Sequence, residues 1–538
     1  MSRSDKFSSV REIADAVCSD IATPEQLEAL EHMLHGNVEA QRFYYDYIAM
    51  HMQLSQCEGP DLELVFRRTT EELVFRPSHS EHRDTPHVMS VDAAPSRKKS
   101  HWLIVPIVIA VVMLCMFIGY RYLSSSSPYI AELSDGSLET IGQGIILGDK
   151  LVAGNYRTLQ PTRVRLGNGN ILHLSANAEF KLFNRQELTF YSGMIEVEST
   201  TGQNTLVHSD SFTLDTNGSD LAVTVDNEQF ELLTGESTLI QPKRWKPKHY
   251  WPFEGASDRV IDTSGDAHGF TGPAARRIDG LVGTGAFAFD NSADARIDVG
   301  SGGGNAPGTG SFAVSDGVTI EALIRPSYTG KFGDIDEIFR KDNGDQELRM
   351  LLSFQHDRGK AYLKPEGDFA QSLSFGLYIL GQGYHELKLP LDGKNGRPSL
   401  AEINNGNSYH VVATYQVNTG RKSIFINGIE LASYQYIPGS KVLSGGPGTA
   451  AVGNNPAQHR WHIEAFNGVI DEVAFYDFAL TPWAIKQHFS EVQKGNNYFG
   501  LSSNQDNLPE NVKIPLSPNS TYVIDPVTGL PDSMKSSE

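Results

Sequence analysis

The feature that most constrains this chain is an uninterrupted apolar stretch, Trp102 to Gly119, which reads WLIVPIVIAVVMLCMFIG. None of its side chains is charged or carries an amide. A helix rises ~1.5 Å per residue and needs about twenty apolar residues to cross a bilayer. We therefore predict a transmembrane helix over 102–123, with Trp102 and Tyr120 in the two interfacial belts. The alternative is a buried core helix, but such a helix rarely lacks a polar face.

The basic residues that flank this stretch predict its orientation. Arg97, Lys98 and Lys99 precede it, whereas only Arg121 follows before Lys150. The positive-inside bias then places the N-terminus in the cytoplasm and the residues after about 123 outside it. A cleaved signal peptide is excluded because about a hundred residues precede the stretch. We expect a single-pass protein of the inner (plasma) membrane, with its C-terminal domains in the periplasm or outside.

Charge and cysteine content narrow the classes of function. The net charge is −20, and the parts before and after the predicted span are both acidic on balance, so we expect no nucleic-acid partner. The three cysteines are Cys18, Cys57 and Cys115, and none of them follows the span. The external part therefore has no disulfides, and it must be stabilised by its core and, if any are bound, by metal ions.

The N-terminal residues 1–57 have the pattern of a small helical module. Thr23 can cap a helix, Pro24 suits its first position, and Gln26 completes a capping box. Leu27, Leu30 and Leu34 then recur at helical spacing. A further helix is expected after Asn37, and residues 58–101, rich in Pro, Ser, Glu and Arg, have the composition of a flexible linker.

The segment TPEQLEALEHMLHGNVEAQRFYYDYIAMHMQL resembles the cytoplasmic module that precedes the span in FecR-type membrane regulators. In that family such modules resemble anti-sigma domains, so the resemblance implies a cytoplasmic partner such as a sigma factor. A self-contained helical bundle with no such partner is the alternative.

Residues 128–242 are predicted to form a β-rich external domain. Short alternating runs dominate, and Asn168-Gly169 is typical of a two-residue hairpin turn. The pieces GDKLVAG, VRLGNGNILHLSANAEFKL, YSGMIEVES and FELLTGESTLI resemble the FecR external domain. The family's Gly-Thr-x-Phe-x-Val pattern is missing, because 217–223 reads NGSDLAV. The resemblance implies the fold, while a signalling role and a merely structural one both stay open.

Residues 248–495 are predicted to form a second all-β domain. Its ordered landmarks are HYWPFE, DTSG followed by HG, GAFAFD, VTIEALIRP, YHVVATY, IFINGIEL with an Asn427-Gly428 turn, and FNGVIDEVAFY, which ends before a helix opened by Thr481-Pro482. This series resembles the laminin-G-like, concanavalin A-like jelly roll, although Leu323 stands where the family usually has Trp. The resemblance implies a lectin-like or protein-binding module. An insert over about 332–400 is expected to shape its rim.

Many relatives of this fold bind a calcium ion, which prefers carboxylate and carbonyl oxygens. The carboxylates that match are Asp262 and Asp471, with Asp290 as a weaker third. The alternative is that Asp262 caps a turn and Asp471 belongs to a β-bulge.

We predict no enzymatic activity. A glycosidase of this fold needs two carboxylates on one face of a strand, and no such strand is apparent. Asp334, Asp336 and Glu337 are interpreted as part of a loop bounded by glycines. Tyr328, Tyr378, Tyr384 and Trp461 are candidates for stacking on a ligand, and residues 500–538 are expected to be a disordered tail.

The predicted fold class is mainly β, with a small helical module and one transmembrane helix. The predicted function is a sensor or regulator that binds an external glycan or protein and contacts a transcriptional partner inside the cell. The alternative is a membrane-anchored binding protein without a signalling role.

Overall fold

The computed structural model describes residues 10, 11, 13, 14, 23, 26, 29, 30, 33, 40 and 44, and then 128–536 apart from 201, 227–228, 301–308, 344–347, 358–361, 364–370, 457–462 and 502–507. The chain divides into two compact units, Met1–Pro106 and Ile107–Glu538. The predicted linker over 58–101 and the predicted span over 102–123 lie outside the described residues. Among the residues described, no helix is both long and apolar enough to cross a bilayer.

The first unit contains the predicted capping box. The Thr23 amide donates to Gln26 Oε1 (2.9 Å), and the Gln26 amide donates to Thr23 Oγ1 (3.3 Å). Further described residues of this unit form a small buried cluster, made of Val10, Ile13, Leu30 and Ala40 with Met33 and Tyr44 packed against them. The helix start predicted at Thr23 is therefore confirmed, and residues far apart in the segment share one core.

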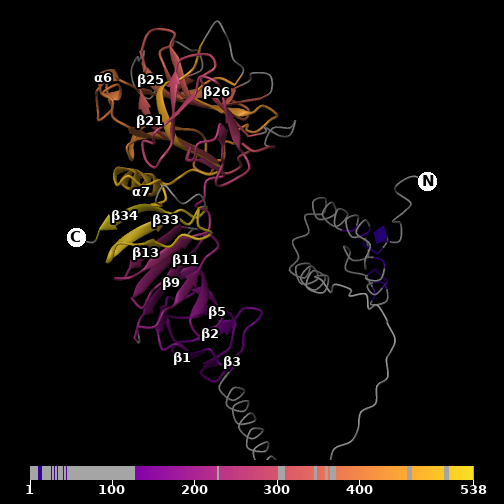
Figure 1. Ribbon diagram of the computed structural model, residues 1–538. Coiled ribbons are helices and arrows are strands. Elements are labelled where there is room, and N and C mark those ends of the chain that lie inside the picture. The colour runs from indigo at the N-terminus through magenta and orange to yellow at the C-terminus, as the bar shows by residue number, and fades with distance from the viewer. Residues whose placement is uncertain are drawn as a thin grey trace, which may run out of the picture. The chain divides into compact units, whose positions relative to one another are not determined.

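The second unit is mainly β, as predicted. Within 128–536 the described helices are α6 (Leu400–Ile403) and α7 (Pro482–Gln493). Thr481 caps α7 by accepting from the Ala484 amide (3.2 Å), and Pro482 opens the helix, as the sequence predicted. The strands belong to two β-domains, which follow one another along the unit (Figure 1).

The first β-domain is a sandwich of two sheets that share the long strand β9 (Glu187–Glu198). One sheet has the order β3 (Ile146–Leu147), β4 (Lys150–Leu151), β1 (Ala131–Asp135), β6 (Thr162–Leu166), β7 (Ile171–Leu174), β9, β12 (Leu221–Asp226), β13 (Gln229–Thr234), β33 (Ser520–Ile524) and β34 (Pro531–Ser536). The other has the order β2 (Leu138–Thr140), β5 (Gly154–Thr158), β8 (Glu179–Leu182), β9, β10 (Leu206–His208), β11 (Phe212–Asp215), β14 (Leu239–Pro242) and β32 (Ile514–Pro515). Buried and exposed residues alternate along strands such as β6, so the core lies between the two sheets.

The C-terminal strands correct the prediction of a disordered tail over 500–538. β33 pairs with β13, so that Phe230 lies opposite Ile524 and Leu232 opposite Tyr522. β32 pairs with β14 in the other sheet. Tyr522 and Ile524 are buried in the core of the first β-domain, which begins almost 400 residues earlier in the chain. The tail prediction is wrong for 514–536, because the segment gains apolar burial from a partner that is remote in sequence.

The second β-domain is a sandwich of two further sheets. One consists of β18 (Arg276–Ile278), β19 (Ala286–Asp290), β31 (Asn467–Tyr476), β21 (Gly317–Pro326), β27 (Tyr409–Gln416), β28 (Arg421–Ile426) and β29 (Ile429–Gln435), with β15 (His249–Trp251) also paired to β31. The other consists of β16 (Arg259–Val260), β17 (Gly269–Thr271), β20 (Ile297–Val299), β30 (Ala450–Val452), β22 (Ile335–Asp342), β23 (Leu348–Gln355), β25 (Ser372–Ile379), β26 (Gly383–Pro390) and β24 (Tyr362–Leu363). We call the second of these the nine-stranded sheet. Asn427 and Gly428 both have positive φ (51° and 77°), which confirms the predicted hairpin between β28 and β29.

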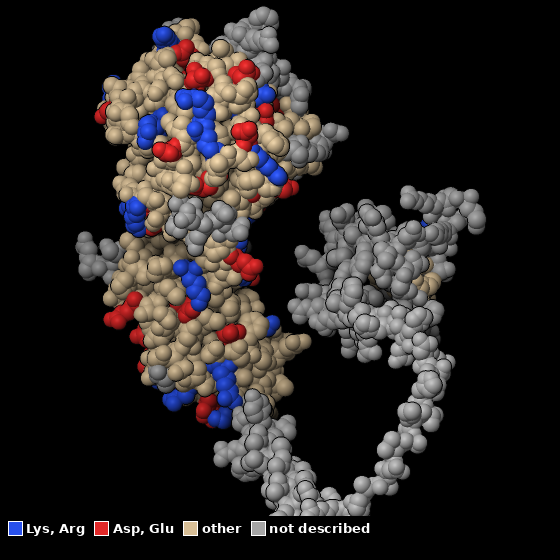
Figure 2. Space-filling model, in the orientation of Figure 1, with Lys and Arg blue, Asp and Glu red and all other residues tan. Residues whose placement is uncertain are grey.

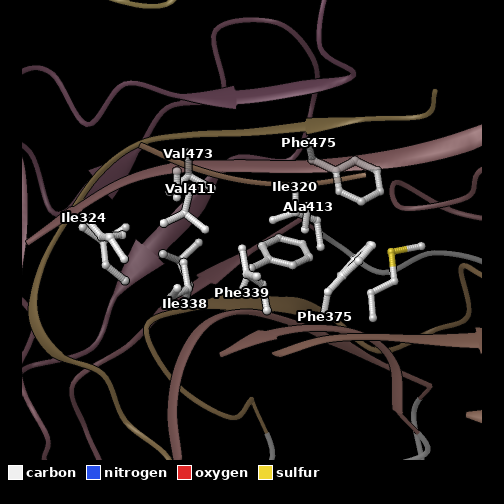
Figure 3. Packing of buried hydrophobic residues seen from close by; sticks show 14 of the residues in the cluster. Ile320, Ile324, Ile338, Phe339, Phe375, Val411, Ala413, Val473 and Phe475 are labelled. Atoms are coloured by element: carbon white, nitrogen blue, oxygen red, sulfur yellow. The ribbon is translucent and has the colours of Figure 1, made fainter. Parts of the chain in front are cut away.

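The core of the second β-domain lies between its two sheets. Phe339 and Phe375 come from the nine-stranded sheet, and they lie close to Ile320 and Phe475 of the facing sheet (Figure 3). The rings of Phe339 and Phe475 stack with centroids 5.8 Å apart. The insert expected to shape a rim instead supplies β22 to β26. It therefore forms half of the nine-stranded sheet, and the prediction of a rim is wrong.

A third buried cluster joins the two β-domains. It includes Trp245 from the connection, Tyr476 from the jelly roll, Ile485 from α7 and Leu530 from the C-terminal segment. Trp483 and Ile514 pack against both this cluster and the core of the first β-domain. The α7 helix lies between the two domains in Figure 1. The apolar contact that holds the two domains together is thus continuous with the core of the first β-domain.

A buried polar network accompanies this junction. Glu321 of β21 is fully buried, and its Oε1 accepts from His410 Nε2 (2.7 Å) and His488 Nδ1 (2.9 Å). Its Oε2 accepts from the Tyr476 hydroxyl (3.0 Å). His488 lies on α7, whereas His410 and Tyr476 lie on strands adjacent to β21. Glu321 therefore fixes α7 to the sheet through one carboxylate.

Candidate functional site

The nine-stranded sheet carries charged and hydroxyl side chains on the face turned away from the core. In β23, Met350, Leu352 and Phe354 enter the core, so residues 349, 351, 353 and 355 must point to the other face. The same alternation holds in β25 and β26. We call the resulting set the polar face: Glu337, Arg340, Asp342, Arg349, Ser353, Gln355, Ser374, Tyr378, Tyr384, Glu386 and Lys388, with Asn455 and Glu464 from the connection after β30.

Strand register places these residues in two neighbouring rows. In the first row Glu337 lies opposite Ser353, Ser353 opposite Ser374, and Ser374 opposite Lys388. The second row consists of Arg340, Leu351, Gly376 and Glu386. A Cβ at Gly376 would overlap the Tyr384 hydroxyl oxygen, so the Tyr384 ring occupies the space that a side chain at 376 would need. Charged groups thus stand at both ends of each row, with uncharged residues between them.

At one end of the rows the guanidinium of Arg340 donates hydrogen bonds to three carboxylates. Arg340 Nη1 donates to Glu337 Oε1 (2.7 Å) and to Glu464 Oε2 (2.8 Å), and Arg340 Nε donates to Asp342 Oδ1 (2.9 Å). Glu337 is only 1% exposed, and its Oε2 is buried without a hydrogen-bond partner. Burial raises the pKa of Glu337 well above its ordinary value, and the neighbouring Glu464 carboxylate adds to that shift.

At the other end Glu386 and Lys388 form a second polar group. Glu386 accepts from the Tyr384 hydroxyl (3.0 Å) and from Ser374 Oγ (3.2 Å), and it lies 3.3 Å from Lys388 Nζ. Lys388 Nζ also donates to Gln355 Oε1 (2.5 Å). Each side chain has several partners, so the whole group is held in one arrangement. Gln355, Ser374 and Lys388 are buried, whereas Tyr384 and Glu386 are partly exposed, so these two side chains are the ones that a ligand carrying hydroxyls can reach.

The predicted aromatic residues have different surroundings. Tyr328 is buried and stacks on Phe354 (5.3 Å between centroids), so it belongs to the core. Tyr378 and Tyr384 lie opposite each other on β25 and β26, and the Arg349 guanidinium lies 5.2 Å from the centroid of the Tyr378 ring. Trp461 lies outside the described residues. The structure therefore places Tyr378 and Tyr384, but not Tyr328, on the polar face.

The sequence interpretation as a loop holds for Asp334, which precedes β22, but it is wrong for Asp336 and Glu337. Asp336 and Glu337 belong to β22, whose regular pairing with β23 is interrupted by a bulge between Glu337 and Phe339. The bulge disturbs the alternation in the sequence, so the strand was not recognised. The alternation in LRMLLSFQ, where Arg, Ser and Gln fall between core residues, is the signal that could have located the polar face.

The structure does not bring together the three carboxylates predicted to bind calcium. Asp262 accepts from His249 Nδ1 (2.6 Å) and from the amides of Tyr250, Ser264, Gly265 and Ala267. Asp471 accepts from the amides of Leu281 and Val282 (2.8 and 3.2 Å) and of Glu472 (2.8 Å). Asp290 is exposed and lies opposite Asn467, four residues from Asp471 along β31.

Asp262 thus organises a turn, as the alternative interpretation had it. No group of three or more His, Cys, Asp or Glu side chains that could hold a metal ion occurs in the described part of the chain. Calcium binding stays a prediction.

Residues 298–486 match a family model described as the concanavalin A-like lectin/glucanases superfamily. No curated protein matches the chain. The C-terminal part of the chain therefore contains a concanavalin A-like jelly-roll domain, as the sequence predicted.

Three solved structures are distantly similar. The first is domain 4 of AbnA, an extracellular arabinanase from Geobacillus stearothermophilus in complex with arabinotriose, with 20% identity, coverage of 45% of this chain and 98% of that chain, and a TM-score of 0.30. The second is the botulinum neurotoxin serotype G binding domain, with 15% identity, coverage of 47% of this chain and 54% of that chain, and a TM-score of 0.34. The third is the binding domain of Paraclostridial Mosquitocidal Protein 1, with 14% identity, coverage of 45% of this chain and 52% of that chain, and a TM-score of 0.32. This chain spans about half the length of the two toxin domains. Likenesses this distant assign no function to it.

Proposed function

We propose that the jelly-roll domain binds a glycan through the polar face. The observation that carries this proposal is the pair of rows. One runs from Glu337 through two serines to Lys388, and the other runs from Arg340 through a leucine and a glycine to Glu386. Charged groups are costly to bury, and apolar residues would pack that face more cheaply. Acidic and basic residues are interspersed over the face of the unit shown in Figure 2. The described part of that side of the unit therefore carries no broad field of one sign, and the proposal depends on local hydrogen bonds at the polar face.

Replacing Glu386 with glutamine is expected to weaken glycan binding roughly 10- to 100-fold, because hydrogen bonds to charged groups contribute about 1.5–3 kcal/mol. A glycan array with the full-length chain identifies the ligand, and titration calorimetry measures the affinity. Glu430→Gln is the matched control, since Glu430 pairs with Arg421 in the sheet on the other side of the core. Equal affinities for the two variants, or no glycan bound by the unmodified chain, would contradict the proposal.

We further propose that this domain binds without catalysing a reaction. On the polar face, Glu337, Asp342 and Glu464 all bond to Arg340, and Glu386 bonds to Tyr384 and Ser374. A hydrolase would instead need one of these carboxyls free to protonate a leaving oxygen and another free to attack or activate water. Release of reducing ends from a bound glycan, abolished by Glu337→Gln, would refute this part.

We also propose that the chain is a single-pass membrane regulator whose cytoplasmic module contacts a transcriptional partner such as a sigma factor. The FecR resemblance of the N-terminal module and of 128–242 supports this role. The capped helix and the small buried cluster of the first unit are consistent with a folded module of this kind. The two β-domains share a buried cluster, so they would move together when a ligand binds to one of them.

A sigma factor is expected to co-purify with the full-length chain from membranes and to be lost when residues 1–57 are deleted. A deletion confined to the linker over 58–101 is the control, because it shortens the chain and keeps the module. If no regulator is captured and deletion of the gene leaves transcription unchanged, the anchored binding protein without signalling is the better description.

A further inference from the structure

A short hairpin at the edge of the first β-domain exposes two aliphatic side chains. β3 and β4 form this hairpin, in which Ile146 lies opposite Leu151 and Leu147 opposite Lys150. Ile145 is 54% exposed and Leu147 is 53% exposed, whereas Ile146 between them packs against the core. Ile145 directly precedes β3, and the Val152 amide donates to its carbonyl (3.4 Å), so the pairing of the hairpin extends to it. Residues two apart in such a pairing point the same way, so Ile145 and Leu147 form one outward apolar pair.

The hairpin is held rigidly. The hydroxyl of the buried Tyr156 donates to the carbonyls of Ile145 (3.1 Å) and Val152 (2.7 Å). The Leu133 amide donates to the Asp149 carbonyl (2.7 Å), which fastens the turn to β1. The exposure of the pair is therefore built into the fold.

The position of the hairpin in the chain limits what can cover it. β4 pairs with β1, where Ala131 lies opposite Leu151. Ala131 follows Leu123, the predicted end of the span, by eight residues, which reach at most about 28 Å when fully extended. Counted from β1, where the tether is attached, the β3 edge lies two strand spacings of ~4.8 Å away, roughly 10 Å, and the β34 edge lies seven spacings away, roughly 34 Å. The β3 edge is therefore the edge of this sheet that lies nearer to the predicted anchor.

We propose that the hairpin over 145–151 docks on the outer surface of the lipid bilayer, with Ile145 and Leu147 inserted at the boundary between headgroups and acyl chains. The inference rests on the proposed membrane span. Single exposed aliphatic residues are common on soluble domains, but this pair is adjacent, rigid and next to the anchor. Docking at a second point would fix the tilt of the first β-domain, and with it the direction in which the jelly roll presents its polar face.

Spin labelling of the full-length chain in phosphatidylcholine–phosphatidylglycerol vesicles tests this contact. A nitroxide is attached at Leu147→Cys in a chain with Cys18, Cys57 and Cys115 replaced by serine, and its collisions with oxygen and with a neutral nickel chelate are compared. Leu159→Cys is the matched control, because Leu159 is 55% exposed and lies just beyond the opposite end of β5. We expect the label at 147 to be several-fold less accessible to nickel and more accessible to oxygen than the label at 159.

A third label, on native Cys115 with Cys18 and Cys57 replaced, reports on the anchor alone. Protection of 115 together with equal behaviour at 147 and 159 would overturn the docking and leave the span intact. Exposure of 115 to nickel would overturn the span and the docking together. Nickel protection at 147 without oxygen enrichment, or protection that fades as the protein is diluted in lipid, would show a protein contact or a second copy and would also overturn the docking.

Discussion

A chain carrying Glu321→Leu is expected to lose about 3–5 kcal/mol of unfolding free energy in its jelly-roll domain. Leucine has a similar volume but accepts no hydrogen bond, so His410, His488 and Tyr476 would all lose their shared acceptor in a buried site. Unsatisfied buried donors retain the full cost of their desolvation. For a domain of this size the loss corresponds to a fall of roughly 6–20 °C in the midpoint of its calorimetric transition.

The same residue should make stability depend on acid pH. Burial alone would raise the pKa of Glu321, but His488 and His410 outweigh it and lower the pKa to about 2, from an ordinary value of 4.5. A depressed pKa in the folded state stabilises the fold fully above about 4.5, and this contribution of about 3 kcal/mol is lost as the pH falls through 2. The difference between the unmodified chain and the leucine variant should therefore shrink over that interval.

Two further variants make this test specific. Glu321→Gln keeps one acceptor oxygen and is expected to lose less stability than the leucine variant. Glu196→Leu removes an exposed carboxylate from β9 and is expected to stay within about 0.5 kcal/mol of the unmodified chain. A jelly-roll transition that is unchanged by Glu321→Leu would show that the network does not stabilise the junction.

Tyr522→Ala is expected to destabilise the first β-domain by about 3–5 kcal/mol, although the residue lies near the C-terminus. Tyr522 is 1% exposed and packs in the core of that domain. Its hydroxyl also accepts from the Ser517 amide (2.8 Å), so the change leaves a cavity and an unpaired donor. Calorimetry of the full-length chain should show the transition of the first β-domain shifted down, with the jelly-roll transition less affected.

Met534→Ala is the control for this prediction, because Met534 is 46% exposed on the neighbouring strand β34. Removal of residues 509–538 is the stronger version of the test. It would leave β13 and β14 without their neighbours β33 and β32, and the exposed strand edges should promote aggregation. If the shortened chain melts like the full chain, the C-terminal strands contribute nothing to the domain.

The parts of the fold that were predictable depend on local chemistry. The positive φ that Asn427-Gly428 adopts, and the capping by Thr481 and by Thr23, follow from residues within a few positions of one another. The C-terminal strands were missed because STYVI is a short run among prolines and serines. Its partner β13 lies almost 300 residues earlier, and nothing in the local pattern points to it.

In the candidate site, too, the features set by local sequence were predictable and the contacts between remote segments were not. Arg349, Ser353 and Gln355 alternate with core residues in one strand, so the polar character of that face was present in the sequence. The meeting of Glu337 with Glu464 through Arg340 depends on sheet register and on a connection more than 120 residues away. The calcium prediction took Asp262 from a landmark of the family, whereas in the structure that carboxylate accepts four backbone amides and a histidine.

The C-terminal strands also determine when the first β-domain can be completed during synthesis. Thr234 and the Ser520 carbonyl that it contacts are 286 residues apart. At about 5–20 residues per second, roughly 15–60 s separate the emergence of β13 from that of β33. Throughout that interval β13 and β14 lack their partner strands β33 and β32, while the jelly roll is still being synthesised. The first β-domain, which begins nearest the predicted membrane span, can thus be completed only after the jelly roll has been synthesised. The first β-domain to begin translation is therefore the second to complete its fold.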